Sequence, residues 1–445
     1  MPHTKPAAPT ASLSVFEGVA MLIGVVIGIG IFKTPSIVAA NVGSEAAFIG
    51  VWLLGGVITL IGALCYAELG SAHPNAGGEY HYLSRAYGQP VGVLFAWARG
   101  TVIQTGAIAA VGFVYGDYAS NLVPLGPFSS SIHAGIAVLA LTAINLVGTP
   151  QSKLTQVLLT ALTVTAVLVV IVGGFSARAP IPAAAAASAP SLGAAGLAMV
   201  FVLLTYGGWN EAAYLTGELK DVRRNMAKTL LIATGSVLVI YLLMNLAYLN
   251  AFGLEGLRRS NAVGADLMRL VAGDTGAILL SLIVCVCALS TLNATIFTGA
   301  RVYYALGSDV STIRVLGVWD ARGHKPGNAL LLQCSIALAL IAFGATTREG
   351  FEAMVAYTAP VFWFFLLLTA LSIFVFRRRG GVANLPFRVP LYPLTPILFA
   401  LACVWMLYSA LAYTGYGAFV GVAVLIAGVP LLLIGKRRAP TADRP

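Results

Sequence analysis

Long apolar stretches alternate with short polar segments along the whole chain. A helix needs about 20 apolar residues to cross the hydrocarbon core of a bilayer, so each stretch predicts one membrane-spanning helix. The predicted spans lie near residues 15–40, 46–69, 90–120, 131–148, 154–175, 193–215, 227–252, 275–303, 328–345, 352–376, 391–413 and 416–435. The pattern therefore predicts an all-α integral membrane protein with twelve transmembrane helices and no soluble domain.

Glycines interrupt the first and the sixth of these stretches. Gly28 and Gly30 break span 1, and Gly207 and Gly208 break span 6. A break frees backbone N–H and C=O groups, which are tolerated at membrane depth only where they are buried in protein or line a cavity. Paired interruptions in the two halves of a chain are typical of transporters and point to the substrate site.

The two breaks divide the chain into repeats. Spans 1–5 (14–175) and spans 6–10 (193–376) each begin with a broken helix. Because each repeat holds an odd number of spans, the two repeats are expected to have inverted topology. Two further spans (391–435) follow, with tails at 1–13 and 436–445.

The direction of the half-helices predicts what they bind. The outer half of span 1 begins after Gly30, and its first N–H groups suit a carboxylate. The outer half of span 6 ends near Tyr206, and its last carbonyl groups suit an ammonium. Gly28 and Gly30 also let a ligand approach the backbone. One site of this kind would fit an α-amino acid. Gly24 and Gly28 taken alone are more typical of close helix packing in lipid, but Gly30, the Lys-Thr-Pro that follows and the second glycine pair favour a broken helix.

Composition and charge agree with a membrane protein. The 445 residues are 59% hydrophobic and 9% charged, against about 25% charged in an average soluble domain. The net charge of +10 lies mostly in loops on one side of the predicted membrane, including Arg377–Arg379. By the positive-inside rule both termini are then cytoplasmic, in the cell (inner) membrane. We interpret these clusters as anchors at the lipid bilayer, with no nucleic-acid partner.

The five cysteines all fall inside apolar spans. They are Cys65, Cys285, Cys287, Cys334 and Cys403. Buried free thiols are expected, with no disulfide framework, no metal site and no cofactor. No outer-loop thiol is available to link a partner subunit, and no partner subunit is evident.

Two charged residues lie close to the breaks. Lys33 is inside span 1, where a charge costs about 2.5–3.5 kcal/mol on insertion scales, so it is a candidate for coupling or gating. It would act as an internal cation or a proton-linked switch; alternatively it snorkels outward or pairs with a fixed carboxylate. Glu211 would carry a proton or, as we favour, brace the break through backbone N–H groups. Arg99 reads as an inner-end anchor, at the opposite end of span 3 from Asp117.

Uncharged residues near the predicted cavity have two interpretations each. Gln104 and Asn293 would line the cavity or form interhelical hydrogen bonds. Trp209 would gate the inner side or only pack. Integral membrane enzymes need a nucleophile with a base, or a metal cluster, at one depth, and the chain offers no such constellation, so we expect no enzymatic activity.

Five short motifs are spread over almost the whole chain. They are Gly28-Ile29-Gly30-Ile31-Phe32, Pro74…Gly77-Gly78-Glu79-Tyr80, Tyr206-Gly207-Gly208-Trp209-Asn210, Ser290-Thr291-Leu292-Asn293-Ala294 with Arg301-Val302-Tyr303-Tyr304, and Pro386-Phe387-Arg388-Val389-Pro390. Together they resemble the amino acid–polyamine–organocation superfamily, close to bacterial relatives of the L-type amino acid transporters. The resemblance implies a twelve-span, five-plus-five inverted-repeat fold and amino acid transport by alternating access.

The resemblance also implies roles for single residues. Gly28, Ile29 (a serine in the family signature) and Gly30 would hold the substrate carboxylate. The carbonyls of 204–207 would hold the amino group, and Asn210 would stabilise the break or touch the substrate; Gly208 belongs to the same motif. The chain departs from the family at Leu204, often an aromatic gate, and at Thr163, where many relatives have a lysine that substitutes for a sodium ion.

The sequence thus predicts a secondary active transporter of amino acids. Neutral L-amino acids are favoured because no fixed charge is evident at the side-chain end of the proposed site. Transport would be proton-linked symport or exchange. A transporter of cationic amino acids or polyamines with the same fold is the alternative, and a channel or sensor is a further one.

Overall fold

The structure is a computed structural model, and it describes residues 13–75, 77–147, 153–177, 192–216, 219–309, 311–318, 326–347, 349–380 and 385–430. Most of both predicted tails lies outside these residues. Within them every element is a helix, apart from an isolated bridge between Leu13 and Leu219.

Helices lie in each of the predicted apolar stretches. Their bounds are α1 Val15–Val26, η1 Ile29–Phe32, α2 Thr34–Ala40, α3 Glu45–Ala72, α4 Gly78–Tyr87, α5 Gln89–Ala98, η2 Arg99–Gln104, α6 Thr105–Leu122, α7 Ser129–Val147, α8 Lys153–Ser176, α9 Leu192–Thr205, η3 Trp209–Glu211, α10 Ala212–Leu215, α11 Val222–Arg258, α12 Val263–Asp309, η4 Ser311–Gly317, α13 Gly327–Ala345, α14 Gly350–Gly380, α15 Leu394–Tyr413 and α16 Tyr416–Ala427.

The helices have the length and composition of a multi-span membrane protein. Among the described residues, nine helices are long and apolar enough to cross a bilayer, or ten if the bent pair Gly193–Thr205 and Trp209–Leu215 counts as one span. Val15–Val26 and Tyr416–Ala427 are shorter apolar helices. The all-α membrane architecture expected from the hydrophobic pattern is therefore confirmed.

Local sequence signals set several helix starts. Ser14 and Glu17 form a reciprocal capping box at the start of α1, which satisfies two backbone N–H groups. Ser44 caps α3 by accepting from the N–H of Ala47 (3.1 Å). Pro35 occupies the first turn of α2, where its missing N–H costs nothing.

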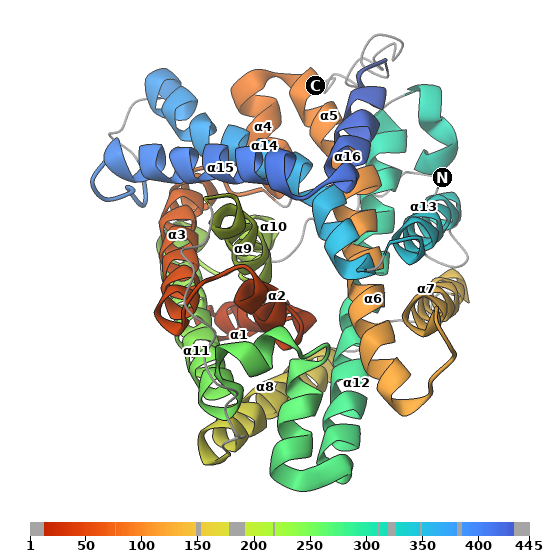
Figure 1. The fold of residues 1–445 in the computed structure, drawn as a ribbon. Coiled ribbons are helices and arrows are strands. Elements are labelled where there is room, and N and C mark those ends of the chain that lie inside the picture. Colours follow the sequence, from red (N-terminus) through yellow and green to blue (C-terminus); the bar gives the residue numbers. More distant parts are fainter. Residues whose placement is uncertain are drawn as a thin grey trace.

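The short broken helices lie in the middle of the bundle. In Figure 1, α1, α2, α9 and α10 are surrounded by α3, α11, α8, α12 and α6, with α14 and α15 along one side. The long helix α11 packs along α3, α1 and α8, and α12 packs along α6 and α8. The breaks are therefore enclosed by protein.

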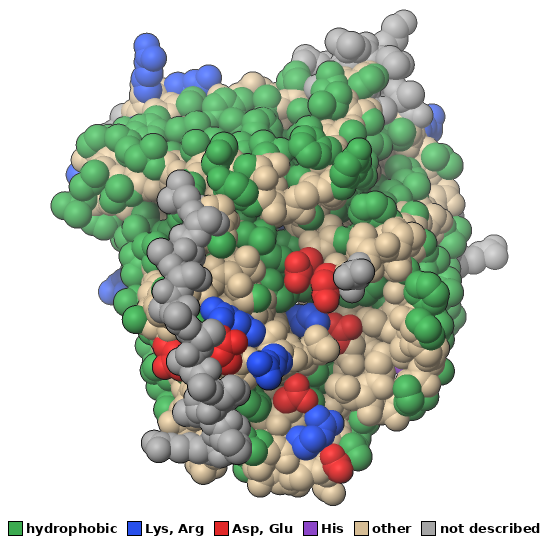
Figure 2. All heavy atoms as spheres, in the orientation of Figure 1, with side chains coloured by type: hydrophobic (Ala, Val, Ile, Leu, Met, Phe, Trp, Pro, Cys, Tyr) green, Lys and Arg blue, Asp and Glu red, His purple; other side chains and the backbone are tan. Residues whose placement is uncertain are grey.

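The two ends of the bundle are named by residues that lie there. We call the end with Leu13 and Asn75 the inner end and the end with Asn41 and Arg258 the outer end. At the outer end, α11 departs from helical geometry at Gly253, and α12 does so at Ala272 and Gly273. Figure 2 shows hydrophobic side chains over much of the visible surface and mixed charges gathered in the middle of that face.

Candidate functional site

The first break lies at Ile27 and Gly28. Helix α1 ends at Val26, and a 3₁₀ turn restarts at Ile29. The N–H of Gly28 donates to the carbonyl of Val26 (2.7 Å). The N–H groups of Ile29 and Gly30 begin the new turn, so no carbonyl of that turn can accept from them. Their N–H groups are therefore not bonded within that turn.

The second break lies at Tyr206–Gly208. The helix axis bends by 41° between α9 and the helix that follows. Gly208 has φ +102°, and a Cβ on Gly207 would lie 2.7 Å from the carbonyl oxygen of Leu204, so both positions require glycine. The interruption is therefore built from the glycines that the sequence pattern singled out.

The two breaks lie side by side and share one buried hydroxyl. The hydroxyl of Tyr241, on α11, lies 2.7 Å from the carbonyl oxygen of Val26 and 3.2 Å from that of Thr205. One O–H donor is thus shared by the last carbonyls of α1 and α9, and it connects the two half-helices. Sequence reasoning missed Tyr241, because a tyrosine within an apolar span carries no signal that it caps a broken helix.

A small pocket adjoins the first break. Its lining comes from Gly24, Ile27, Gly28 and Ile29 beside three groups of α8 and three of α12: Leu159, Thr160, Thr163, Cys287, Ser290 and Thr291. The cavity volume is about 20 Å³, enough for one water molecule and too small for an amino acid. The conformation is closed around this place, and Thr163 lies within it, 3.0 Å from the sulfur of Cys287.

Gln104 and Asn293 form interhelical hydrogen bonds in this conformation. The Gln104 amide donates to the carbonyl of Thr295 and the hydroxyl of Thr298, both at 3.1 Å. Asn293 accepts from Asn145 (2.6 Å). Interhelical hydrogen bonding was the alternative to lining a cavity for both residues. Gln104 joins span 3 to α12, and Asn293 joins α12 to span 4.

Lys33 forms a buried ion pair near the outer end. Its Nζ lies 3.0 Å from Asp117 Oδ2 and donates to the carbonyl of Asn261 (3.3 Å). Asp117 also accepts from the hydroxyl of Ser130 (2.8 Å). Pairing with a fixed carboxylate was one of the alternatives for Lys33; the sequence did not show that Asp117 supplies that carboxylate.

A second contact holds α2 at the outer end. Arg258 Nε donates to the carbonyl of Ala39 (2.8 Å) and Nη2 to that of Val42 (2.6 Å). Arg258 also pairs with Glu255. A cation at the carbonyl end of a helix is electrostatically favourable. The hairpin between α11 and α12 is therefore fastened to the outer half of span 1.

The largest polar cluster lies on the inner side of the second break. Glu79, on α4, is its centre, and Arg99 and Glu211 complete it. Glu79 accepts hydrogen bonds from Tyr66 Oη (2.5 Å), Asn210 Nδ2 (3.2 Å), Tyr214 Oη (3.2 Å) and Arg99 Nη1 (3.3 Å). Burial raises the pKa of the Glu79 carboxyl, and Arg99 and the Tyr66 hydrogen bond oppose that rise. We call these six residues the inner cluster.

Arg99 joins α4 to the half-helix after the second break. Its Nη2 lies 2.8 and 2.9 Å from the two carboxylate oxygens of Glu211. Arg99 is buried in a six-residue π-helical turn, Arg99–Gln104, and is no membrane-surface anchor. Glu211 thus pairs with the guanidinium of Arg99, whereas the bracing of the break through backbone N–H groups stays a prediction. Trp209 packs edge-on against Tyr66, with ring centroids 4.9 Å apart.

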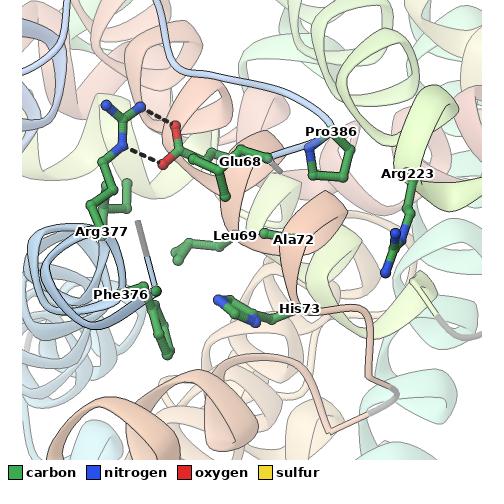
Figure 3. A pocket seen from close by; sticks show the side chains of 11 residues that line it. Glu68, Leu69, Ala72, His73, Arg223, Phe376, Arg377 and Pro386 are labelled. Atoms are coloured by element: carbon green, nitrogen blue, oxygen red, sulfur yellow. Dashed lines mark hydrogen bonds and ion pairs between the residues drawn. The ribbon is translucent and has the colours of Figure 1, made fainter. Parts of the chain in front are cut away.

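Another ion pair at the inner end links α3 to α14. Arg377 Nε and Nη2 lie 2.8 and 2.5 Å from the two oxygens of Glu68, as Figure 3 shows. The N–H of Val389 also donates to Glu68 (2.7 Å). Glu68 thus links α3 to α14 and to the segment that leads to α15.

The structure offers no constellation for metal chemistry in the residues that it describes. No group of three His, Cys, Asp or Glu side chains there could hold a metal ion. The five cysteines are free and buried.

Comparison with known proteins places the chain in a family. The family model described as amino acid permease matches residues 13–429. The mouse b(0,+)-type amino acid transporter 1 is 29% identical over 399 residues, which cover 87% of this chain and 81% of the relative. The mouse large neutral amino acids transporter small subunit 2 is 28% identical (93% and 79%), and the human cystine/glutamate transporter 24% (94% and 84%). The chain belongs to the amino acid permease family, whose members are transporters and not enzymes.

Proposed function

We propose that this protein is a secondary active transporter that moves amino acids, with a preference for neutral L-amino acids, across the cell membrane. The observation that carries the proposal is the pair of adjacent breaks with opposite polarity, joined by Tyr241. Two relatives that are named as amino acid transporters also support it, because the match with this chain covers 81% and 79% of their length.

The architecture that we propose has twelve spans in a five-plus-five inverted repeat. Residues 14–175 and 193–376 form the repeats, and 391–435 adds the last two spans. Both termini are cytoplasmic, so the inner end faces the cytoplasm. The basic residues near that end, such as Arg223 and Arg377–Arg379, support this orientation.

Substrate would bind between the breaks. The N–H groups at Gly28–Gly30 hold its carboxylate, and the carbonyls from Leu204 to Gly207 hold its ammonium. Asn210 stabilises the second break. The charged groups nearest the breaks are paired with each other, Lys33 with Asp117 and Arg99 with Glu211. This leaves no fixed charge to recognise a charged side chain, which favours neutral substrates over cationic amino acids or polyamines.

Alternating access would open one end at a time. The inner cluster closes the inner end, and the contacts of Lys33 and Arg258 close the outer end. Opening inward separates Arg99 from Glu211, and opening outward releases α2 from the hairpin between α11 and α12. Lys33 and Glu211 are thereby gating residues, and Trp209 moves with the inner half of span 6.

Coupling would be proton-linked symport or amino acid exchange. Thr163 lies in the small pocket beside the first break. It carries no charge, so a coupling proton must act elsewhere in this chain. Lys33 with Asp117 and Glu79 with Arg99 are two ion pairs near the breaks that a proton could break.

The test uses Gly28→Ala in proteoliposomes. The nearest atom to a Cβ at Gly28 would be the carbonyl oxygen of Val26, at 3.9 Å, so the variant should fold. It should nevertheless obstruct the approach of a carboxylate to the backbone, and KM should rise about tenfold or more. Gly50→Ala is the matched control, because its Cβ enters open space. Unchanged KM in folded Gly28→Ala would contradict the proposed site.

The same proteoliposomes settle substrate and coupling. A competition panel of neutral, cationic and acidic amino acids and a polyamine is run with and without an imposed pH gradient. Uptake stimulated by the gradient supports symport, and uptake that requires internal amino acid supports exchange. Transport by the purified chain alone would support the absence of an obligatory partner subunit. Failure of every amino acid to compete would reject the function.

A further inference from the structure

A second pocket lies at the inner end, away from the two breaks. Its cavity volume is about 180 Å³. It is bordered by the end of α3, the start of α11, the end of α14 and the segment that leads to α15. The lining residues on which the argument depends are Glu68, His73, Arg223, Phe376 and Arg377. Elements of both proposed repeats therefore meet around one space.

The charge of this pocket is unbalanced. The carboxylate of Glu68 is neutralised by Arg377, which contacts both of its oxygens. Arg223 has no hydrogen bond or ion pair to any residue that the structure describes. Figure 3 shows its side chain on α11, on the side of the pocket away from the Glu68–Arg377 pair. A net positive charge thus remains on the side of the pocket that holds Arg223.

His73 adds a hydrogen-bond donor to the same side. Its Nδ1 lies 3.4 Å from Arg85 Nη1. A guanidinium can only donate, so Nδ1 is the acceptor and the proton of the neutral ring is on Nε2. Burial, together with the charges of Arg85 and His81, lowers the pKa of His73. The ring is held 4.3 Å from that of Phe376.

We propose that this pocket binds the phosphate group of an anionic ligand, with Arg223 and the Nε2–H of His73 as donors. A phosphate offers only acceptor oxygens at neutral pH and matches the planar fork of an arginine. Basic pockets between membrane helices on the cytoplasmic side are suited to anionic lipid headgroups. The inference rests on the proposed orientation of the inner end and is independent of the substrate site.

Occupancy of the pocket would have a mechanical effect. The phosphate would join α3 to α11 across the space that now separates His73 from Arg223. It would do so beside the Glu68–Arg377 pair, which already holds α14. A bound anion therefore stabilises the closed arrangement of the inner end without touching the substrate.

The experiment compares the full chain in nanodiscs of phosphatidylglycerol and of phosphatidylcholine. Phosphatidylglycerol should raise the midpoint of thermal unfolding, and native mass spectrometry should show retained anionic lipid. Arg223→Gln should weaken retention about fivefold, because it removes one of the two donors that hold the headgroup phosphate in the pocket. Arg224→Gln is the matched control, since Arg224 is the exposed neighbour that does not line the pocket.

The source of the phosphate is distinguished in the same series. Inorganic phosphate is added to the phosphatidylcholine nanodiscs, and stabilisation there that Arg223→Gln removes identifies a free anion. A bound phosphate should also raise the pKa of His73 in labelled protein. Arg85, His81, Arg377 and Glu68 are all retained in that protein. Equal effects of Arg223→Gln and Arg224→Gln, or no stabilisation by either source, would overturn the proposal. Binding is measured without uptake, so its failure leaves the transport proposal standing.

Discussion

Replacing Arg99 by alanine should loosen the inner end of the protein more than the loss of any exposed ion pair. Arg99 contacts carboxylates on two different elements, Glu79 on α4 and Glu211 after the second break. The side chains of Arg99 and Glu79 are 11% and 6% exposed, whereas that of Glu211 is 38% exposed. The variant therefore leaves one carboxylate buried without its cation and the other partly hydrated.

The exposed fractions of these side chains set the size of the expected loss of stability. Removing one partner of a buried ion pair costs about 3–5 kcal/mol. Glu79 keeps three uncharged donors, which lowers the cost, and the partly exposed contact with Glu211 adds at most about 1 kcal/mol. We expect the free energy of opening of residues 209–216 to fall by about 2–3 kcal/mol, which is roughly a 30- to 150-fold faster amide hydrogen exchange.

Two comparisons test this reasoning at pH 8. Glu211→Gln should accelerate exchange less than about fivefold, because its partner Arg99 still pairs with Glu79. The double variant Arg99→Ala/Glu79→Gln should exchange more slowly than Arg99→Ala, because it removes the uncompensated charge. Exchange in Arg99→Ala within twofold of the parent protein would refute the argument, as would a double variant that is the least protected of the series.

Three further outcomes are expected. Tyr241→Phe should lower the free energy of unfolding by about 1–2 kcal/mol and raise KM. Tyr248→Phe is the control on the same helix: it removes a buried hydroxyl that has no hydrogen-bond partner among the described residues, and it should change stability by less than about 0.5 kcal/mol. Equal effects of the two variants in thermal melts would speak against the shared cap. Lys33→Ala and Asp117→Ala should each reduce uptake severely, and the double variant should recover stability, so unchanged transport and pH profile in Lys33→Ala would remove its gating role. Because burial raises the pKa of Glu79, its proton stabilises the folded state, and thermal stability should fall as pH rises above about 4.5 through the raised pKa; Glu79→Gln should flatten that slope.

The sequence predicted the features that depend on local chemistry. Uninterrupted apolar runs of span length predicted the membrane helices, and glycines within two runs predicted the breaks at Gly28 and at Gly207–Gly208. The buried thiols followed from their place in apolar spans. Each of these conclusions needs only the chain near the residue itself.

The features that the sequence left open depend on how helices are rotated against one another. Nothing along spans 1 and 3 shows that Lys33 and Asp117 face each other, because the rotation of each span is set by packing. Glu79 follows Gly78, whose φ of +50° lets α4 begin against the ring of Tyr214. A carboxylate between two predicted spans thereby becomes the centre of a buried cluster, which no periodicity predicts.

The π-helical turn at Arg99–Gln104 determines how this span would respond to the insertion or deletion of one residue. A wide turn holds one residue more than an α-helix of the same rise, so it offsets the side chains on its two sides by about 100°. Tyr357 donates to the carbonyl of Thr101 within this turn (2.8 Å). Deleting one residue there would restore a regular helix and carry Arg99 out of register with both carboxylates, while Ile108 and the rest of α6 kept their packing. An insertion or deletion of a single residue in this turn would thus displace Arg99 from its two carboxylates and leave the packing of α6 unchanged.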